Sequence, residues 1–279
     1  MTTTLRPTGP IQHEADGAAS RTYQVCVNSR PVGTTELATL PAMGAKAGTI
    51  RSLGIDEPDR RRGRGTVAAL AAEEVLRGWG CTQVLVSVPP EATAALRLTT
   101  ALGYTVRSRN MLKELPARPP ALPAHVEGRP MTEAEFVSWR ETAVENYARS
   151  WADRGIPPEV ARAKSEAEHR DMLPEGRATP RTFLNVLVHE GAVVGHVFIG
   201  PREVRPGEQG AYVYDVEVAE ARRGAGHGRS LMLLAERVVL EAGTRLLGLH
   251  VFADNTPAVG LYESLGYETT SVNVFKHLL

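Results

Sequence analysis

The sequence predicts an α/β protein made of two tandem copies of one domain, each a mixed, mostly antiparallel, twisted sheet flanked by helices. Two observations predict this fold class. Residues 60–115 resemble residues 223–278 at one constant offset, and fixed self-similarity indicates repeated structural units. In the second copy, segments with strand and helix patterns follow one another in an order that gives a sheet with helices on both faces.

The repeat keeps one register without a gap from Arg60 to Leu115. Gly63 of the first copy aligns with Gly226 of the second, an offset of 163 residues. Chance does not hold one register over this length, so we interpret the repeat as two copies of one domain. The "LGY" triplet that begins at Leu265 also recurs in the first copy, and we expect it to supply core and strand-entry residues.

Composition excludes several classes of protein. The 279 residues are enough for two domains, and 42% hydrophobic with 23% charged residues is ordinary for a globular protein. Thirty-two basic residues balance 32 acidic ones, so neither nucleic acid nor a membrane is expected as a partner. Cys26 and Cys81 belong to no CxxC motif or Cys/His cluster, and no metal or disulfide framework is predicted.

The N-terminus is polar, and no apolar run approaches the roughly 20 residues of a membrane span. We therefore expect a soluble cytoplasmic protein. Residues 1–20 are expected to be a flexible N-terminus, residues 21–116 the degenerate first domain, and residues 117–279 the second domain. Five prolines among residues 116–130 predict a stiff linker that also carries a first strand at residues 125–129.

Two helices are expected next, in the second copy only. Thr132 and Glu135 form a capping box, and apolar residues then recur at helical spacing until Gly155 ends the helix. Pro157 opens a second helix that extends to about Leu173. The first copy has only a short polar segment before its first long strand, so we expect it to lack both helices.

The remaining elements of the second copy are read from apolar alternation and turn residues. Residues 182–200 form two strands about a turn at Glu190 and Gly191, and residues 210–218 form the third long strand. A glycine-rich turn comes next. It is followed by a helix at residues 229–242, a strand at 246–252, a helix at 256–265 and a last strand at 269–278.

The glycine-rich turn has glycine at every second position, at Gly224, Gly226 and Gly228. Successive backbone N–H groups at a helix start, with the positive end of the helix dipole behind them, bind an anion when no side chain obstructs them. The turn lacks the lysine of a Walker loop and the spacing of a dinucleotide fingerprint. It therefore predicts an anion site of another kind.

Two motifs resemble those of one family, the GCN5-related N-acetyltransferases (GNATs). The pattern Arg223-x-x-Gly226-x-Gly228 resembles their pyrophosphate loop, and residues 255–267 resemble their N-x-x-A-x-x-L-Y-x-x-x-G-F/Y signature. The resemblance covers about residues 125–279 in full and 21–115 in a degraded form. It implies two tandem GNAT-like domains and an enzyme that transfers an acetyl group from acetyl-CoA, by direct attack, to the amine of a small molecule.

The resemblance also implies which residues bind the cosubstrate. Backbone groups near Val216 and Val218 pair with the pantetheine arm, in the manner of an added strand. Asn255 contacts the pantetheine or, alternatively, is a simple helix cap. The pyrophosphate lies on the loop and helix start, at Arg223, Gly224, Ala225, Gly226, His227, Gly228, Arg229 and Ser230.

Catalytic candidates follow from the same resemblance. Tyr262 matches the position of the general acid that protonates the leaving thiolate; packing on the cofactor without proton transfer is the alternative. The position where relatives often have a glutamate base is Tyr212, so the base stays open. Asp215 and Glu217 on the same strand are candidates, directly or through a water, with an exposed charged face as the alternative. His250 on the next strand is the third candidate, against a structural role.

The first copy has Ala92 and Thr99 in place of the signature asparagine and tyrosine, so catalysis by this route is not expected there. It retains Gly63 and Gly65 but has Arg61 opposite the first loop glycine. A structural role is expected, while weak coenzyme A binding stays open. Such tandem organisation resembles that of mycothiol synthases and some antibiotic-modifying acetyltransferases.

The sequence leaves two classes of function open. One is the acetyltransferase, with a small-molecule amine or a peptide amino terminus as acceptor, and the other is a non-catalytic coenzyme A binding or interaction module. The missing glutamate at the usual position of the base favours the second class, whereas Tyr262 and Asn255 favour the first. The acceptor, the acyl chain length and a homodimer are left open.

Overall fold

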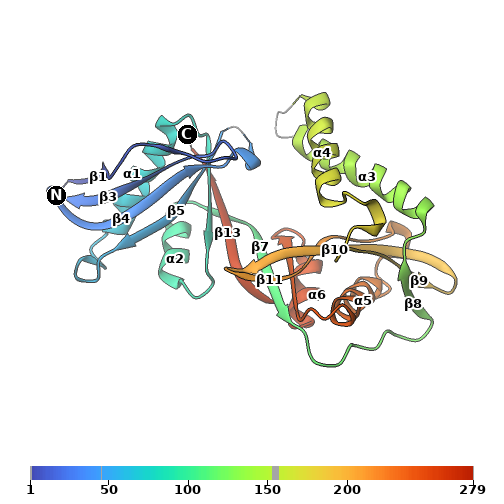
Figure 1. The fold of residues 1–279 in the computed structure, drawn as a ribbon. Coiled ribbons are helices and arrows are strands. Elements are labelled where there is room, and N and C mark those ends of the chain that lie inside the picture. Colours follow the sequence, from blue (N-terminus) through green and yellow to red (C-terminus); the bar gives the residue numbers. More distant parts are fainter. Residues whose placement is uncertain (1, 45, 153–156, 279) are drawn as a thin grey trace. The chain divides into compact units, whose positions relative to one another are not determined.

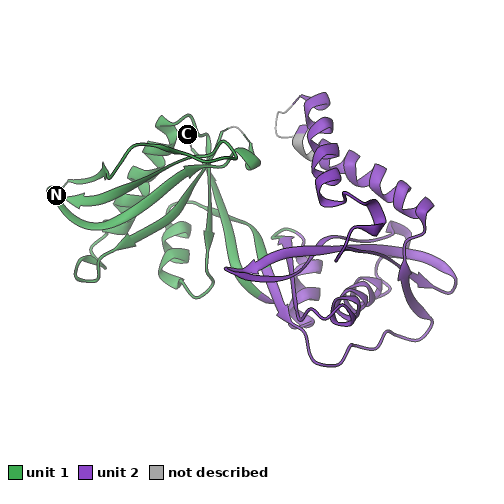
Figure 2. Cartoon of the chain, viewed as in Figure 1, with its two compact units in different colours: residues 1–110, 252–254, 269–279 green, residues 111–251, 255–268 purple. Residues whose placement is uncertain are grey.

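The computed structural model describes residues 2–44, 46–152 and 157–278. Its chain divides into two compact units, coloured separately in Figure 2. Unit 1 comprises Met1–Asn110, Phe252–Asp254 and Thr269–Leu279, and unit 2 comprises Met111–Val251 and Asn255–Glu268. The mixed, mostly antiparallel sheet architecture predicted for the chain is confirmed.

Unit 1 is built on a sheet in which neighbours are antiparallel apart from one parallel pair, β5 with β6. Helices α1 and α2 pack on this sheet around a core that includes Leu37, Leu76 and Val84. The elements in chain order are β1 (Thr3–Pro7), β2 (Gln12–His13), β3 (Ala19–Val27), β4 (Arg30–Thr39), β5 (Ala47–Ile55), α1 (Arg64–Gly78), β6 (Gln83–Val88) and α2 (Thr93–Ala101).

The N-terminal residues differ from the expected flexible segment. Thr3–Pro7 form strand β1, which pairs antiparallel with β3 from Thr3 opposite Val27 to Pro7 opposite Tyr23. The reason is hydrophobic, because Leu5 packs against two apolar clusters of the unit. The expectation that no helix precedes the first long strand is met within residues 2–18.

Unit 2 has helices on both faces of its sheet, as Figure 1 shows: α3 and α4 on one face, α5 and α6 on the other. The larger core, with Leu187, Ile199 and Leu231, lies under α5. The elements are β8 (Val126–Pro130), α3 (Glu133–Ala152), α4 (Pro158–Met172), β9 (Phe183–His189), β10 (Ala192–Arg205), β11 (Glu208–Val218), α5 (His227–Glu241), β12 (Leu246–Phe252) and α6 (Thr256–Ser264).

Local signals in the sequence place several of these elements correctly. The backbone N–H of Thr132 donates to Glu135 Oε2 at 2.7 Å, and the N–H of Glu135 donates to Thr132 Oγ1 at 3.3 Å, which is the predicted capping box of α3. Glu190 and Gly191 both have positive φ, as the tight turn between β9 and β10 requires. The predicted end of α3 at Gly155 lies outside the described residues.

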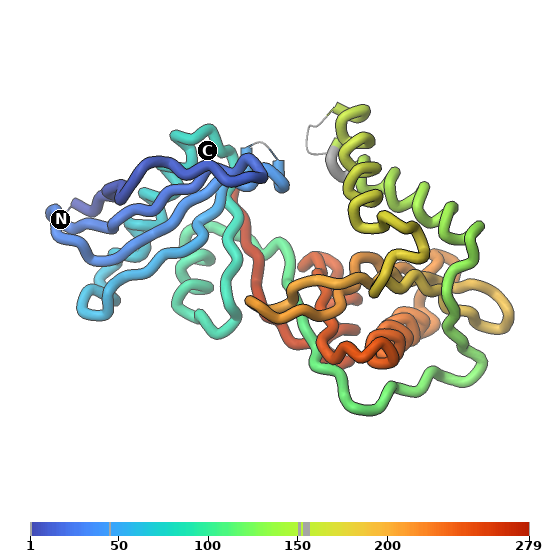
Figure 3. Tube along the Cα trace, viewed as in Figure 1, coloured from blue at the N-terminus to red at the C-terminus, as the bar shows by residue number. Residues whose placement is uncertain are grey.

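The last strand of the second copy lies almost entirely in unit 1, and the end of the last strand of the first copy lies in unit 2. Strand β13 (Glu268–His277) pairs antiparallel with β6, from Val272 opposite Val88 to His277 opposite Gln83. In Figure 3 the red C-terminal segment runs into unit 1 beside the teal chain near residues 83–88, its partner strand. Residues 111–114 of β7 (Thr105–Glu114), the last strand of the first copy, belong to unit 2, where β7 neighbours β12. The units therefore do not follow the linear division at residue 116.

A buried ion pair holds each exchanged strand. In unit 2, Lys113 Nζ lies 2.6 Å from Glu236 Oε1 and 5.5 Å from the centre of the Tyr267 ring. The equivalent contacts of unit 1 join Lys276 to Glu73 at 2.7 Å and to the Tyr104 ring at 5.6 Å. Each lysine thus contacts the glutamate and the "LGY" tyrosine of the opposite copy.

We expect Lys113→Met to reduce the free energy of unfolding by about 3–5 kcal/mol, because it leaves a buried carboxylate without its cation. The Glu236 side chain is 1% exposed, so water cannot replace the lysine. The measurement is urea unfolding in a double-mutant cycle with Glu236→Gln, which should give a large coupling energy. The matched cycle of Lys113→Met with Glu73→Gln should give a coupling near zero; the reverse result would contradict the exchange.

Candidate active site

Strands β11 and β12 diverge at the centre of unit 2. They pair in parallel at Ala211–Leu247, Tyr212–Gly248 and Val213–Leu249, and the pairing stops there although β11 continues to Val218. Beyond that point β11 is paired with β10 on its other side, including Val197 with Val216 and Gly195 with Val218. The backbone around Val216 and Val218 therefore has one edge without a neighbouring strand, which the predicted pairing with an extended pantetheine arm requires.

A β-bulge marks the start of this divergence. On β10, Phe198 pairs with Asp215 and the next residue, Ile199, pairs with Val213, so Tyr214 is the extra residue of β11. A bulge bends its strand and increases the local twist. The bulge thus turns the end of β11 away from β12.

The glycine loop lies between the end of β11 and the start of α5. Gly224 (φ +81°) and Gly226 (φ +82°) have left-handed backbone, and Gly226 is the N-cap of α5. A Cβ atom at either position would meet nothing within 4 Å, so the space in front of the loop is open. The first N–H groups of a helix have no partner inside it, which leaves this end able to bind an anion.

The other loop residues of the predicted set have different surroundings. The backbone N–H groups of Arg229 and Ser230 already donate to the Gly226 carbonyl, at 3.1 and 3.3 Å. Arg223 Nε donates to the Val218 carbonyl at 3.2 Å, which ties the loop to the end of β11. Ala225 is exposed between the two left-handed glycines. An anion at this end would therefore be bound by the backbone N–H groups that precede Arg229.

His227 is the first residue of α5 and is 6% exposed. Its ring lies 5.0 Å from the ring of His189 at the end of β9. Burial, followed by the charges of His189 and Arg222, lowers the pKa of His227 below its ordinary value of 6.5. The folded protein therefore binds this proton less readily than the unfolded chain does.

A pH dependence of stability follows from that direction. Because the folded pKa is lowered, the stability contributed by His227 is present above about pH 6.5 and is lost as the pH falls through the folded pKa. We expect the wild type to lose more free energy of unfolding than His227→Gln does between pH 7.5 and 5. Urea unfolding of both proteins at pH 7.5 and pH 5 measures the two losses in free energy of unfolding. An equal loss in the two proteins would show that His227 does not titrate as argued.

Helix α6 and its N-cap carry the two candidate site residues of the second motif. Asn255 Oδ1 accepts a hydrogen bond from the Ala258 N–H at 3.3 Å, so the side chain caps α6. Tyr262 is 7% exposed, packs in the main core of unit 2 and lies 5.9 Å from the Tyr267 ring. Burial raises the pKa of Tyr262. The phenol therefore keeps its proton at neutral pH, as a general acid must.

The carboxylates named as candidate bases have unequal surroundings. Asp215 Oδ2 lies 2.9 Å from Trp139 Nε1 of α3 and 2.9 Å from His196 Nε2 of β10. Burial raises the pKa of Asp215, but the hydrogen bond and charge of His196 and the hydrogen bond from Trp139 outweigh it, and the pKa is lowered. Glu217 is half exposed, 3.6 Å from the Arg223 guanidinium. Asp215 is thus an ionised carboxylate with two donors.

Two positions of the sequence analysis remain, His250 on β12 and Tyr212 on β11. His250 is exposed on β12. Tyr212 occupies the position of the missing glutamate, and its ring lies 4.1 Å from the Arg202 guanidinium. Sequence reasoning did not single out Trp139 or His196 for chemistry. One signal in the sequence pointed to His196: it lies on the strand predicted just before the strand of Asp215 and Glu217, and consecutive strands often pair as a hairpin.

The first copy keeps the shape of the loop without the second motif. Arg61 (φ +58°) and Gly63 (φ +73°) repeat the left-handed backbone of Gly224 and Gly226. Thr99 Oγ1 donates to the Leu96 carbonyl of its own helix at 2.9 Å, in the position of Tyr262. The first copy therefore has the backbone of the loop but no phenol for the acid.

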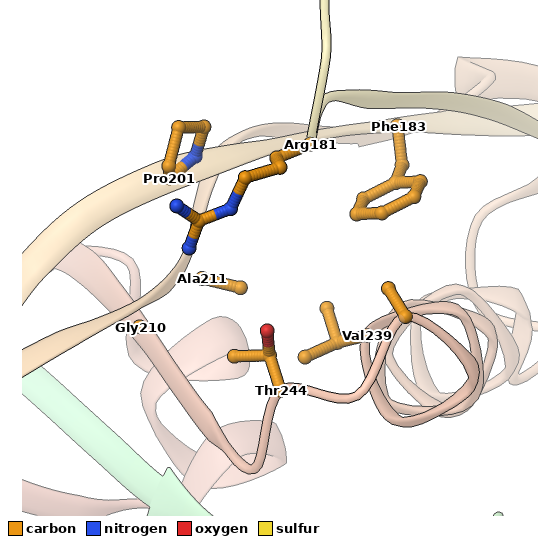
Figure 4. Close-up of a pocket in the computed structure, with 8 residues that line it drawn as sticks. Arg181, Phe183, Pro201, Gly210, Ala211, Val239 and Thr244 are labelled. Carbon is orange, nitrogen blue, oxygen red and sulfur yellow. The ribbon is translucent and has the colours of Figure 1, made fainter.

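A separate pocket lies at the other end of α5, near Val239 and Thr244 (Figure 4). Arg181 and Phe183 reach toward it from the opposite side. Its volume of about 30 Å³ leaves room for little more than water, so it does not suit coenzyme A. Among the described residues, no group of three or more His, Cys, Asp or Glu side chains is arranged to hold a metal, and no helix there is long and apolar enough to cross a membrane.

Comparisons with known proteins show the family of the chain. The model of the "Acetyltransferase (GNAT) family" matches residues 3–104 and 140–267. The N-acetyltransferase YdgE of Bacillus subtilis is 33% identical over 150 residues, which are 53% of this chain and 95% of YdgE. The mycothiol acetyltransferase of Saccharomonospora viridis is 28% identical over 288 residues, covering 97% of this chain and 87% of that protein.

One solved structure has the same tandem arrangement. It is described as a tandem GNAT protein from the clavulanic acid biosynthesis pathway, and it is 20% identical with a TM-score of 0.52. The match covers 95% of this chain and 85% of that one. At this identity the likeness concerns the fold alone.

Proposed function

Because the chain belongs to the GNAT acetyltransferase family, we propose that its second copy transfers an acetyl group from acetyl-CoA to the amine of a small molecule. One observation carries the proposal. The divergence of β11 from β12 leaves a strand edge open directly before the left-handed glycine loop and the start of α5. An extended arm with an anionic group at one end fits that combination.

The reaction is acyl transfer by direct attack. The amine lone pair forms a bond to the acetyl carbon, the C–S bond breaks, and its electron pair leaves with the sulfur. Backbone N–H groups at the open edge of β11 would polarise the thioester carbonyl. Tyr262 would give its proton to the thiolate. Val216 and Val218 would hold the pantetheine arm, Asn255 would fix the start of α6, and the loop from Arg223 to Ser230 would hold the pyrophosphate.

Two observations favour a small-molecule acceptor. Relatives that match most of this chain at low identity are named mycothiol acetyltransferases. Helix α3, which the first copy lacks, covers the face of β11 that carries Asp215, since Trp139 of α3 donates to that carboxylate. This is the face on which we place the acceptor.

The test is thiol release from acetyl-CoA in the presence of a panel of small amines, with mass spectrometry of the products. Acetylation of any amine at a rate above hydrolysis supports the proposal. Isothermal titration with coenzyme A runs in parallel. Binding of coenzyme A without acetylation of any amine in the panel would favour the non-catalytic binding module instead.

A further inference from the structure

One cluster outside the coenzyme A parts joins three elements of unit 2. His196 of β10 and Trp139 of α3 both lie 2.9 Å from the same oxygen, Oδ2 of Asp215 on β11. The side chain of His196 is 22% exposed, and Trp139 is buried. Solvent therefore reaches the histidine of the cluster but not its tryptophan.

The direction of the histidine hydrogen bond follows from its partners. The indole N–H of Trp139 only donates, and an ionised carboxylate only accepts. Asp215 Oδ2 thus receives both bonds, and His196 must carry its proton on Nε2. In the neutral ring the other nitrogen, Nδ1, then has a lone pair that can accept a proton. Nδ1 has no hydrogen-bond partner within the described part of the chain.

The position of the cluster suits an incoming amine. Asp215 is next to the bulge at Tyr214, where β11 begins to diverge from β12. Glu217 pairs directly with His196 across the two strands, which adds a second carboxylate to this face. On its other side, His196 pairs with the uncharged Val186 of β9. The charged groups of the neighbouring strand that face His196, Asp215 and Glu217, are negative, and Glu217 also lies 3.6 Å from the Arg223 guanidinium. The negative charge of Asp215 attracts a cationic amine.

We propose that His196 is the general base of the reaction and that Asp215 positions it. This inference rests on the proposed acetyl transfer. His196 Nδ1 takes a proton from the acceptor nitrogen, whose lone pair forms the C–N bond as the C–S bond breaks. The thiolate takes its proton from Tyr262, whose phenolate then regains a proton from water, and the imidazolium, stabilised by Asp215, gives its proton to water. Trp139 fixes Asp215 and is a positioning residue as well.

The tautomer provides a test that does not depend on activity. Two-dimensional ¹H–¹⁵N NMR of the full chain, with His196→Gln to assign the signal, should show His196 as the Nε2–H tautomer near pH 8. In Asp215→Asn this preference should weaken. An Nδ1–H tautomer in the wild type would overturn the proposal, because Nδ1 would have no lone pair for the proton.

The kinetic test uses whichever amine of the panel is acetylated. His196→Gln should lower kcat by roughly 10²–10⁴-fold, the range of a positioned base, while coenzyme A affinity stays within twofold. Asp215→Asn should lower kcat less and move the acid limb of the pH–kcat profile to lower pH, which a purely structural role would not do. The control is His13→Gln, an exposed histidine of unit 1, and its kcat should be unchanged.

The outcomes separate the two proposals. If an amine is acetylated and His196→Gln keeps kcat within about twofold of wild type, the base assignment is wrong and the acetyltransferase stands. If the wild type acetylates no amine in the panel, the proposed function fails, and the role of His196 fails with it whatever the tautomer.

Discussion

Gly226→Val is expected to weaken coenzyme A binding by at least about 100-fold, or about 2.7 kcal/mol. Gly226 is the N-cap of α5, and the space in front of it is open. A branched side chain there would occupy the volume that we assign to the pyrophosphate. The left-handed backbone, with φ +82°, would also be strained by about 1–2 kcal/mol in any residue with a Cβ atom. Isothermal titration with coenzyme A measures the change.

The first copy supplies a matched control for the strain. Gly63 has φ +73°, is the N-cap of α1 and also faces open space. Gly63→Val should therefore cost a similar free energy of unfolding but leave coenzyme A affinity and turnover almost unchanged. Equal coenzyme A affinity in Gly226→Val and wild type would show that the glycine loop does not bind the pyrophosphate. A collapse of turnover in a folded Gly63→Val protein would show that the first copy is not silent.

Tyr262→Phe is expected to lower kcat by roughly 10²–10⁴-fold, or about 3–5 kcal/mol of barrier, with little change in coenzyme A affinity. The ring packs in the core of unit 2, so phenylalanine keeps the packing and deletes only the hydroxyl. A thiol has a pKa of only about 8.5 and leaves readily near neutral pH. If the thiolate leaves readily without a general acid, the fall in kcat lies at the low end of this range. Steady-state kinetics with an acetylated amine and titration with coenzyme A measure the two quantities.

Thr99→Val is the matched control, because it removes a hydroxyl at the equivalent position of the first copy. Its kcat should equal that of wild type. A Tyr262→Phe enzyme with kcat within twofold of wild type would identify Tyr262 as a packing residue. A parallel loss of coenzyme A affinity would indicate damage to the pocket rather than loss of an acid.

Local signals predicted those parts of the fold that depend on neighbouring residues. The capping box of Thr132 and Glu135 and the turn at Glu190 are satisfied within a few residues of chain, so the sequence contains all that determines them. The glycine loop is similar, because a left-handed N-cap favours glycine wherever it occurs. For these elements the prediction and the structure agree.

The strand exchange was not predictable for the opposite reason. Lys113 and Lys276 occupy equivalent positions of the repeat, and so do the glutamates that they contact. Either lysine satisfies either glutamate, so the residue pattern alone does not select a partner. Strand β1 was missed because a single apolar residue, Leu5, anchors it in an otherwise polar segment.

The contact between His196 and Asp215 depends on distant geometry. It requires the hairpin register of β10 and β11 and the extra residue at Tyr214, which shifts that register by one position. A one-residue shift reverses the face on which every following side chain lies. The resemblance and the position on the strand therefore gave Asp215 as a candidate base without its histidine.

The exchanged strands also determine the order in which the chain can complete its fold during synthesis. The ribosome makes the N-terminal copy first, yet β6 receives its antiparallel neighbour β13 only after nearly all of unit 2 has been translated. Until then the edge of β6 has unpaired backbone groups, and such edges are sites of aggregation. Nascent chains halted before residue 268 should therefore depend on chaperones, and neither copy expressed alone would contain the strand that closes its own unit.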